Sequence, residues 1–432
     1  ETDIYSSEWP VANRAIELYL QKKSENEGWE RQINGLSNNE KANLLLEKHT
    51  FKELLADVEQ RNLQNNIVGL EASRLFARSE INMGVDAFRD SLYAMLKRNT
   101  FLNIKFENML DTLGEMSRTD LYSYLKEWEQ LTPLPFYSIG EPELTKVVNK
   151  GGEEFFVLKV LVSNNSDYDG IIQMNVLQNG WWYQPMEDPR ARKKVEIAAH
   201  TSKEFVSVWE EQIRDVEINT MVSGNLPYMI RQSIGNVKQE RNKIVKDTIY
   251  TLPESSLEMP GEVIVDNEDS TLFVLSTPAV VGLLPKWLDK VEDTSFKYSG
   301  ISWWRAPLQW TATTNAKYYG KYIRSAYVIK SGDGSQTATW KIPVPEAGQY
   351  ELYYHVFKDD ELRWNDRLQG EYHFRVAYDS EMEDAYINLR KANEGWEQLG
   401  TYYFSADTVR VVLTDECKLR SVTADAVKIV KR

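Results

Sequence analysis

Clusters of tryptophan are the residues of this sequence best suited to ligand chemistry. Trp303, Trp304 and Arg305 are consecutive in a polar stretch, and Trp310 follows them. A flat indole ring covers the CH face of a sugar while the sugar hydroxyls stay in water, so such a cluster suits glycan stacking. Trp364 lies in a charged turn and is expected to be exposed. We therefore predict a glycan-stacking site made of Trp303, Trp304, Arg305, Trp310 and Trp364.

A second aromatic cluster follows an Asn-Gly turn near the middle of the chain. Trp181, Trp182 and Tyr183 form this cluster, and they are the secondary candidate for the same chemistry. The alternative for both clusters is that the rings fill a core between sheets or domains, where Trp is also common. Trp340 and Trp396 fall in strand patterns, and we expect both of them in a core.

Residues that could support catalysis or bind a metal are few. The four histidines, at positions 49, 200, 355 and 373, are far apart in sequence, and Cys417 is the only cysteine. The sequence has no His-Glu-x-x-His, no Gly-x-Ser-x-Gly and no phosphate loop. Asp266, Glu268 and Asp269 carry the oxygen atoms that calcium prefers, but they lack a regular loop spacing. We predict no catalytic residue, no metal and no cofactor in this chain.

The charge balance restricts the partners. The chain has 432 residues, with 51 Lys and Arg against 65 Asp and Glu, for a formal net charge of -14. A surface of this sign repels nucleic-acid phosphates and anionic membranes, and no stretch is as apolar as a membrane span requires. The chain opens at Glu1 without a Met. We expect a mature or trimmed piece of a secreted, periplasmic or cell-surface protein.

The hydrophobic pattern changes from helical to β after the first third of the chain. Residues 1–134 show apolar positions at three-to-four spacing, with helices expected over residues 67–76 and 88–96 and Gly84 between them. Thr119 is the expected N-cap of a last helix that ends at Trp128. The sequence therefore predicts an N-terminal helical domain over residues 1–134.

After Pro135 the apolar period becomes two, which is typical of strands. Alternating segments at residues 155–162, 171–176, 195–197, 205–209 and 216–219 predict an Ig-like antiparallel β-sandwich over residues 135–238. The polar residues 239–260 are expected to form a linker or a long hairpin. Residues 261–432 carry a further all-β pattern, with strands expected at residues 337–342, 350–356, 372–376, 400–404, 409–414 and 424–430. The predicted fold class is therefore multidomain α + β.

The C-terminal region resembles a known family. The segment Trp-Glu-Gln-Leu-Gly-Thr-Tyr-Tyr-Phe at 396–404 is followed by Val-Val-Leu-Thr at 411–414 and Ala-Asp-Ala-Val at 424–427. This order is similar to that of the golvesin/xanthan-lyase carbohydrate-binding-like domain over residues 261–432, apart from an insertion at 271–298. The resemblance implies a jelly-roll-like β-sandwich and a sugar-binding role, and it does not imply lyase chemistry. Asp425, within the last motif, is expected to satisfy loop amides.

The helical region resembles the C-terminal helices of thermolysin-like zinc aminopeptidases (gluzincins). Residues 69–76, 84–88, 101–105 and 121–128 carry this likeness. The sequence departs from that family in the spacing of Gly69 and Gly84, in Asn65 and Asn66 near the position of its catalytic Tyr, and in the missing zinc motif. The resemblance implies either that a catalytic domain lies upstream of Glu1 or that the relationship is only structural. The alternative is an ordinary helical bundle with chance matches to this family.

Three readings of function follow from the sequence. The leading one is a secreted or cell-surface bacterial multidomain protein with a carbohydrate-binding C-terminal module, a polysaccharide partner and no catalytic centre in this chain. The first alternative is the non-catalytic C-terminal part of a zinc aminopeptidase-like hydrolase. The second alternative is a structural scaffold without a ligand. Exposure of the Trp303, Trp304 and Trp310 rings separates the leading reading from the scaffold.

Overall fold

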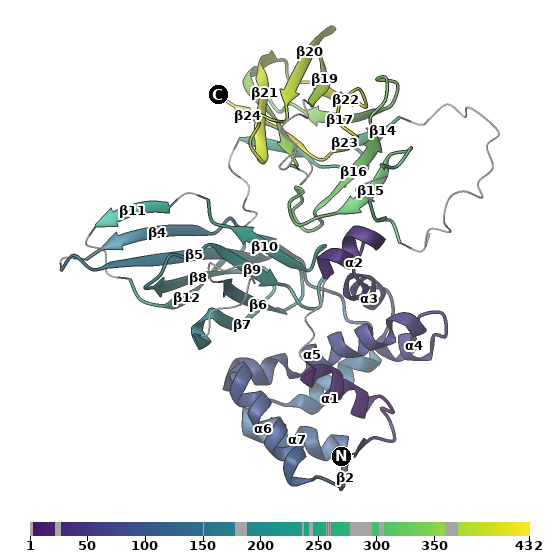
Figure 1. The fold of residues 1–432 in the computed structure, drawn as a ribbon, viewed down its shortest axis with the longest axis vertical. Helices are drawn as coiled ribbons and strands as arrows, with labels where there is room; N and C mark the ends of the chain where they lie inside the picture. The colour runs from purple at the N-terminus through teal and green to yellow at the C-terminus, as the bar shows by residue number, and fades with distance from the viewer. Residues whose placement is uncertain are drawn as a thin grey trace. The chain divides into compact units, whose positions relative to one another are not determined.

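The chain folds into two compact units, each of which joins segments distant in sequence. The computed structural model describes residues 3–21, 27–149, 151–177, 188–235, 237–241, 245–255, 257, 259, 261–276, 296–301, 306–358 and 370–432. The first unit combines residues 1–25 and 38–257, and the second combines residues 26–37 and 258–432. Helices gather in the N-terminal third of the chain and strands in the rest (Figure 1). The α + β composition predicted from the sequence is therefore confirmed.

A helical bundle around α5 (Gln64–Met83) forms the first part of the first unit. Ile67, Leu75 and Phe76 of α5 are buried, and α5 packs against α1, α3, α6 and α7. Gly84 ends α5 at a positive φ of 88°, a conformation that suits glycine because it lacks a Cβ. The remaining elements are α1 (Ala12–Leu20), α3 (Asn38–Leu46), α4 (Phe51–Ala56), α6 (Val85–Arg98), α7 (Phe106–Ser117), α8 (Leu121–Lys126), the 3-10 turns η1 (Arg61–Leu63) and η2 (Glu127–Glu129), and the paired short strands β1 (Asp3–Tyr5) and β2 (Asn103–Lys105).

Helices α5 and α6 confirm the two helices expected over residues 67–76 and 88–96. The start of the last helix differs by one residue from the prediction. Asp120, not Thr119, is the N-cap of α8, because its carboxylate accepts the Ser123 N–H at 3.1 Å. The Thr119 hydroxyl instead donates to the Ser117 carbonyl at 3.2 Å.

The second part of the first unit is a sandwich of two sheets. The strand orders are β10-β9-β6-β7 and β11-β4-β5-β8-β12, with β3 paired to β5. Val160, Ile172 and Phe205 point inward from alternating positions and are buried in its core. The strands are β3 (Tyr137–Ile139), β4 (Glu143–Val148), β5 (Glu154–Asn164), β6 (Gly170–Leu177), β7 (Arg192–Ile197), β8 (Thr201–Trp209), β9 (Asp215–Asn219), β10 (Met229–Ser233), β11 (Val237–Arg241) and β12 (Thr248–Pro253), with the 3-10 turn η3 (Pro189–Ala191).

Two strands fall in or next to the segment expected to be a linker. Strand β12 pairs antiparallel with β8, and β11 pairs in parallel with β4, so both edges of this sheet are built by residues after 236. The linker prediction over 239–260 is therefore wrong for residues 239–241 and 248–253, and the sandwich is not purely antiparallel. No side chain of either strand is buried, which reflects their place at the sheet edges. The Ig-like assignment stays a prediction.

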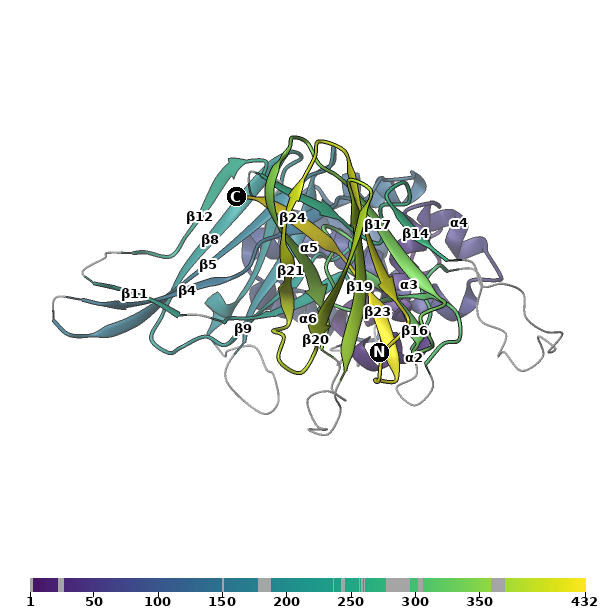
Figure 2. The ribbon, with the colours of Figure 1, turned by 90° about the horizontal axis from the view of Figure 1, so that it is seen from above.

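The second unit is a larger β-sandwich. One sheet has the order β13-β24-β18-β21, the other β14-β17-β22-β19-β20, and a three-stranded sheet has the order β15-β16-β23. Figure 2 shows β21 and β24 on one side of this unit and β17 and β19 on the other. Trp340, Tyr354 and Phe374 are fully buried in the core. The strands are β13 (Glu262–Val265), β14 (Phe273–Leu275), β15 (Thr311–Thr314), β16 (Ser325–Lys330), β17 (Thr337–Pro343), β18 (Gly348–Val356), β19 (Glu371–Tyr378), β20 (Glu381–Asn388), β21 (Gly395–Phe404), β22 (Thr408–Thr414), β23 (Ser421–Ala424) and β24 (Val427–Lys431).

The six strands expected in this region are confirmed, with the last of them divided into β23 and β24. Strand β20 was not predicted from the sequence. Only Ala385 and Ile387 of its residues are buried, so its sequence lacks a clear apolar period. The jelly-roll-like assignment stays a prediction.

Residues 26–37, including helix α2 (Glu27–Asn34), belong to the second unit and not to the helical bundle. The backbones approach closely here: a Cβ on Gly300 would lie 1.9 Å from the Ile33 carbonyl oxygen, and one on Gly35 would lie 2.4 Å from the Ser299 backbone. The Thr314 hydroxyl also donates to the Gly35 carbonyl at 2.9 Å. The helical domain predicted as the continuous segment 1–134 is therefore interrupted. In the part of the chain that the structure describes, the helices are too short or too polar to cross a membrane.

Candidate functional site

The outer face of the sheet β13-β24-β18-β21 presents aromatic and charged side chains to solvent. Strand β18 alternates strictly: Tyr350, Leu352, Tyr354 and Val356 are buried, whereas its intervening side chains face outward. His355 of β18 lies directly opposite Trp396 of β21 in the register of the two strands. The strand alternation therefore places an imidazole and an indole side by side on the open face of the sheet.

Three rings meet at this end of the face. The centroids of Tyr319 and Trp396 are 5.0 Å apart, those of His355 and Trp396 are 5.2 Å apart, and those of Tyr319 and His355 are 5.8 Å apart. These separations lie within the range of favourable aromatic contacts. All three side chains are partly exposed, so the ring group is accessible from solvent. We call Tyr319, His355 and Trp396 the aromatic trio.

The buried carboxylate of Asp425 holds two members of the trio, Tyr319 and His355, in position. Asp425 has no exposed surface, accepts a hydrogen bond from the Tyr319 backbone N–H at 3.2 Å, and lies 2.9 Å from Nδ1 of His355. Burial raises the pKa of the Asp425 carboxyl, against the lowering effect of the nearby His355. The Trp340 indole donates to the Asp425 carbonyl at 3.2 Å. Asp425 thus ties the loop of Tyr319 to the ring of His355, as its predicted structural role requires.

A lysine continues the site along the sheet. The Lys428 ammonium lies 4.8 Å from the Trp396 ring centroid and 5.4 Å from the Tyr353 ring centroid, within the range of cation–π contacts. It also donates to the Glu262 carboxylate at 2.8 Å. The Tyr353 hydroxyl donates to Glu351 at 2.5 Å. The rings and ion pairs hold one another in place, so the face is ordered before any ligand arrives.

This arrangement suits binding of a polar molecule that has apolar faces. The trio supplies flat apolar surface, while the nearly buried Lys428–Glu262 pair supports the Trp396 ring from the side. Nε2 of His355 makes no hydrogen bond to any described residue, so it is available to a ligand hydroxyl. A sugar has this combination of apolar CH faces and hydroxyl groups.

Most of the residues predicted as glycan contacts lie outside the described residues: Trp303, Trp304, Arg305, Trp364, Trp181, Trp182 and Tyr183. Trp310 is described and is half-buried against the core of the second unit. Its indole Nε1 is shielded from solvent and has no hydrogen-bond partner. Trp310 therefore contributes at least as much to packing as to any exposed stacking surface.

Of the two tryptophans expected in the core, only one is buried there. Trp340 is fully buried, as predicted, but Trp396 lies on the outer face of the sheet, so the core prediction for it is wrong. Tyr319, His355 and Lys428 were not predicted as site residues from the sequence. One signal was available, because His355 occupies an outward position of an alternating strand.

The acidic residues weighed as calcium ligands are engaged with protein groups. A Glu268 oxygen accepts from the Tyr298 hydroxyl at 3.1 Å, and the Lys297 ammonium donates to its other oxygen at 2.5 Å. Asp269 accepts the Asp266 N–H at 2.9 Å. Within the described residues, no group of three or more His, Cys, Asp or Glu side chains is arranged to hold a metal ion.

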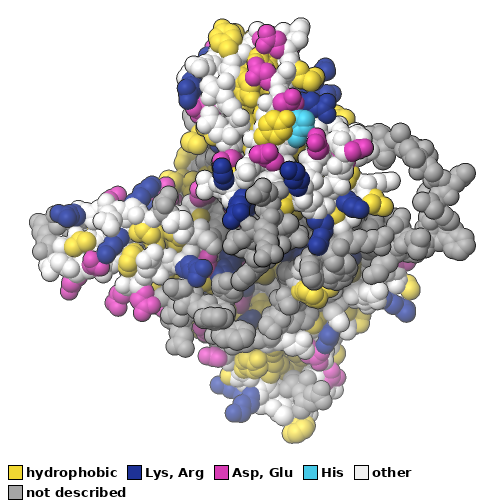
Figure 3. Space-filling model, turned by 45° about the horizontal axis from the view of Figure 1, so that its top comes forward, with side chains coloured by type: hydrophobic (Ala, Val, Ile, Leu, Met, Phe, Trp, Pro, Cys, Tyr) yellow, Lys and Arg dark blue, Asp and Glu magenta, His cyan; other side chains and the backbone are white. Residues whose placement is uncertain are grey.

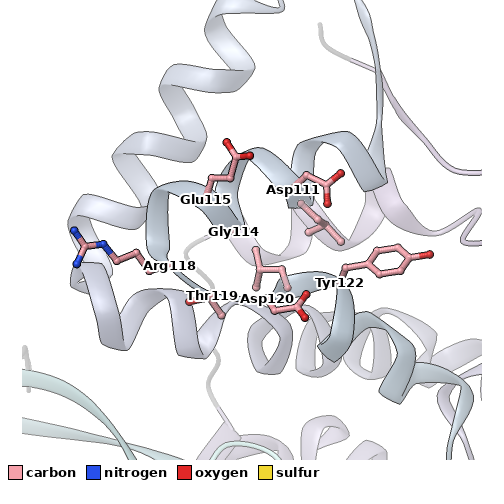
Figure 4. Close-up of a pocket in the computed structure, with 9 residues that line it drawn as sticks. Asp111, Gly114, Glu115, Arg118, Thr119, Asp120 and Tyr122 are labelled. Atoms are coloured by element: carbon pink, nitrogen blue, oxygen red, sulfur yellow. The ribbon is translucent and has the colours of Figure 1, made fainter.

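A separate pocket of about 450 Å³ lies in the first unit, between the end of α7 and the start of α8. Figure 4 shows the carboxylates of Asp111, Glu115 and Asp120 around it, with Arg118 extending away from Asp111. Asp120 is already used as the N-cap of α8. The pocket has an acidic lining and lacks the ring cluster of the second unit, so we assign no ligand to it.

Comparison with known families identifies the C-terminal region. Residues 304–431 match the model of the golvesin C-terminal domain. The predicted golvesin-like resemblance is therefore confirmed for this segment, which is less than half of the chain. A comparison with curated protein sequences gave no match. The likeness of the helical region to zinc aminopeptidases stays a prediction.

Several solved structures share limited similarity with the chain. A xanthan lyase from Paenibacillus is 16% identical with a TM-score of 0.28, over 70% of this chain and 27% of that one. The Podospora anserina GH26-CBM35 β-(1,4)-mannanase is 12% identical with a TM-score of 0.21, over 40% and 28% of the two chains. CBM35 from Cellvibrio japonicus Abf62 is 12% identical with a TM-score of 0.18, over 26% and 75%. The chain thus spans little more than a quarter of the length of the first two proteins.

Proposed function

We propose that the second unit is a carbohydrate-binding module and that the aromatic trio is its contact surface. The observation that carries the proposal is the group of Tyr319, His355 and Trp396 on an open sheet face, held by the buried Asp425. Ordered rings lower the entropy cost of binding, because they need not be fixed by the ligand. The golvesin-like resemblance of this region supports the same ligand class.

The chain as a whole is proposed to be a multidomain protein that acts at the cell surface or outside the cell. In this proposal the second unit holds a polysaccharide, and no residue of this chain catalyses a reaction. Trp303, Trp304, Arg305 and Trp364 remain proposed further contacts, with Trp181, Trp182 and Tyr183 as a secondary set. The trio is proposed to supply the stacking energy.

The test is a Trp396→Ala variant of the full chain, screened with the wild type on a glycan array and by affinity electrophoresis in polysaccharide gels. We expect the variant to bind at least about tenfold more weakly, since a lost ring contact is worth about 1–2 kcal/mol. Trp29→Ala is the matched control, because Trp29 is 55% exposed on α2 and belongs to the same unit. Equal binding by the Trp396 variant and the wild type, at unchanged thermal midpoints, would remove the trio from the proposal. A wild type that binds no glycan would reject the function itself.

A further inference from the structure

A group of three cations crosses the outer face of the other sheet of the second unit. Lys341 of β17 lies directly opposite Arg410 of β22. Arg375 of β19 lies opposite Val412, two residues along β22 from Arg410, and is therefore its diagonal neighbour on the same face. We call Lys341, Arg375 and Arg410 the cationic face.

None of these three side chains forms an ion pair or a hydrogen bond with any residue that the structure describes. Nε of Arg375 is shielded from solvent and likewise lacks a partner. Other cations of the same unit are paired, such as Lys428 with Glu262 and Lys317 with Glu394. The cationic face therefore does not follow from a shortage of acidic residues in a chain of net charge -14.

The placement of these charges works against folding. Like charges directly opposite on neighbouring strands repel one another, and Lys341 and Arg410 occupy such a pair. Asp384 lies opposite Arg375, but its carboxylate lies 2.8 Å from Nε2 of His373 and does not pair with the arginine. Like charges opposite one another suit a surface that meets an anionic partner, because the partner's charge would offset their repulsion.

The groups beside the cations suit a sugar chain. The Tyr386 ring lies flat against His373, with centroids 4.9 Å apart and an interplanar angle of 7°, and the tyrosine is 55% exposed. Thr337 and Thr339 of β17 are partly exposed on the same side of the sheet as Lys341. The face thus combines an aromatic surface, hydroxyl groups and unpaired cations. Figure 3 shows basic side chains among acidic and hydrophobic ones on one side of the molecule.

We propose that the cationic face binds an acidic polysaccharide, with Arg410, Lys341 and Arg375 pairing with its carboxylates and Tyr386 stacking on a sugar ring. The face is distinct from the aromatic trio, and only the sugar nature of the ligand rests on the proposed function. Nucleic acid is tested as the alternative ligand, because three cations would also attract a phosphate backbone.

The experiment compares polygalacturonate with the same polymer after full methyl esterification, which removes the carboxylate charges and keeps the backbone. Binding to the full chain is measured by isothermal titration at two salt concentrations, together with a single-stranded DNA probe. The test variant is Lys341→Gln with Arg410→Gln. The matched control is Lys97→Gln with Arg98→Gln, which removes two exposed cations from α6 that likewise have no partner among the described residues.

We expect the wild type to bind polygalacturonate in a salt-sensitive way and the esterified polymer at least about tenfold more weakly. The test variant should lose about tenfold in affinity for polygalacturonate, and the control variant should bind as the wild type does. The thermal midpoint of the test variant should not fall, because the substitution of Lys341 and Arg410 removes a repulsive pair. Equal losses in both variants would assign the effect to net charge and overturn the proposal, as would tighter binding of DNA than of polygalacturonate. A Trp396→Ala variant that keeps this binding would show that the two faces act separately, so either proposal can fail alone.

Discussion

Lys194 of strand β7 and Glu80 of helix α5 form a buried ion pair that joins the helical bundle to the first sandwich. The side chains are 7% and 0% exposed, and the Glu80 carboxylate also accepts the Tyr19 hydroxyl at 2.9 Å. Arg78 of the same helix donates to Glu196 of the same strand at 2.9 Å. These contacts explain why residues 38–257 form one compact unit instead of two separate domains.

Breaking the pair from one side should be strongly destabilising. Lys194→Met leaves the Glu80 carboxylate buried without its ion-pair partner, and we expect a loss of about 3–5 kcal/mol in the free energy of unfolding. Urea unfolding followed by circular dichroism measures it. The double variant Lys194→Met, Glu80→Gln should recover part of the loss, since the unpaired charge is gone. Equal losses in the single and double variants would show that the buried charge is not the cause.

The carboxyl of Asp266 should make the second unit less stable as pH rises. Burial, with repulsion from Asp425 as the next cause, raises the pKa of Asp266 well above its usual range. The folded state then binds more protons than the unfolded chain from about pH 4 up to the raised pKa, so stability falls as pH rises through that interval. The stability of Asp266→Asn relative to the wild type should therefore increase as pH rises above about pH 4.

The control for this prediction is Asp333→Asn. Hydrogen bonds from Ser335 lower the pKa of the exposed Asp333, so its contribution is present above about pH 4 and is lost on acidification. The urea midpoint of Asp333→Asn should therefore fall relative to that of the wild type as pH rises, whereas the midpoint of Asp266→Asn should rise relative to it. A pH-independent difference for Asp266→Asn would contradict the prediction.

Within the second unit, the backbone of α2 lies so close to Gly300 that a side chain at position 300 should not be tolerated. A Cβ at Gly300 would lie 1.9 Å from the Ile33 carbonyl, so Gly300→Ala must displace the end of α2, at an expected cost of about 1–3 kcal/mol. Hydrogen exchange of residues 27–37 measures the loosening. Gly235→Ala is the matched control, because a Cβ there meets nothing within 4 Å. Unchanged exchange in the Gly300 variant would refute the prediction.

Local patterns in the sequence were enough to predict most elements. The period-two segments at 155–162 and 350–356 became β5 and β18, and Gly84 separated α5 from α6 as expected. These features depend on residues within a few positions of one another, which is the range at which periodicity and capping act. The edge strands β11 and β12 were missed because none of their side chains is buried, so no buried face imposes a period of two on their sequence.

The candidate site depends on pairing between distant segments, which periodicity does not reveal. Trp396 was expected in the core because its motif is strand-like, but its face is decided by the register with His355, after an irregularity in the pairing beside Leu352. The opposition of Lys341 and Arg410 likewise exists only once β17 and β22 are paired. The predicted role of Asp425 was right because a buried carboxylate among small residues needs donors close by.

Because residues 26–37 interrupt the first unit, the second unit is not encoded by one contiguous segment of the gene. A recombination event that moved only residues 258–432 into another gene would leave the Thr314 hydroxyl without the Gly35 carbonyl and Gly300 without the helix packed on it. The segment that could be shuffled intact must include residues 26–37, and these lie inside the first unit in sequence. A contiguous C-terminal segment alone would therefore leave these two contacts unmade.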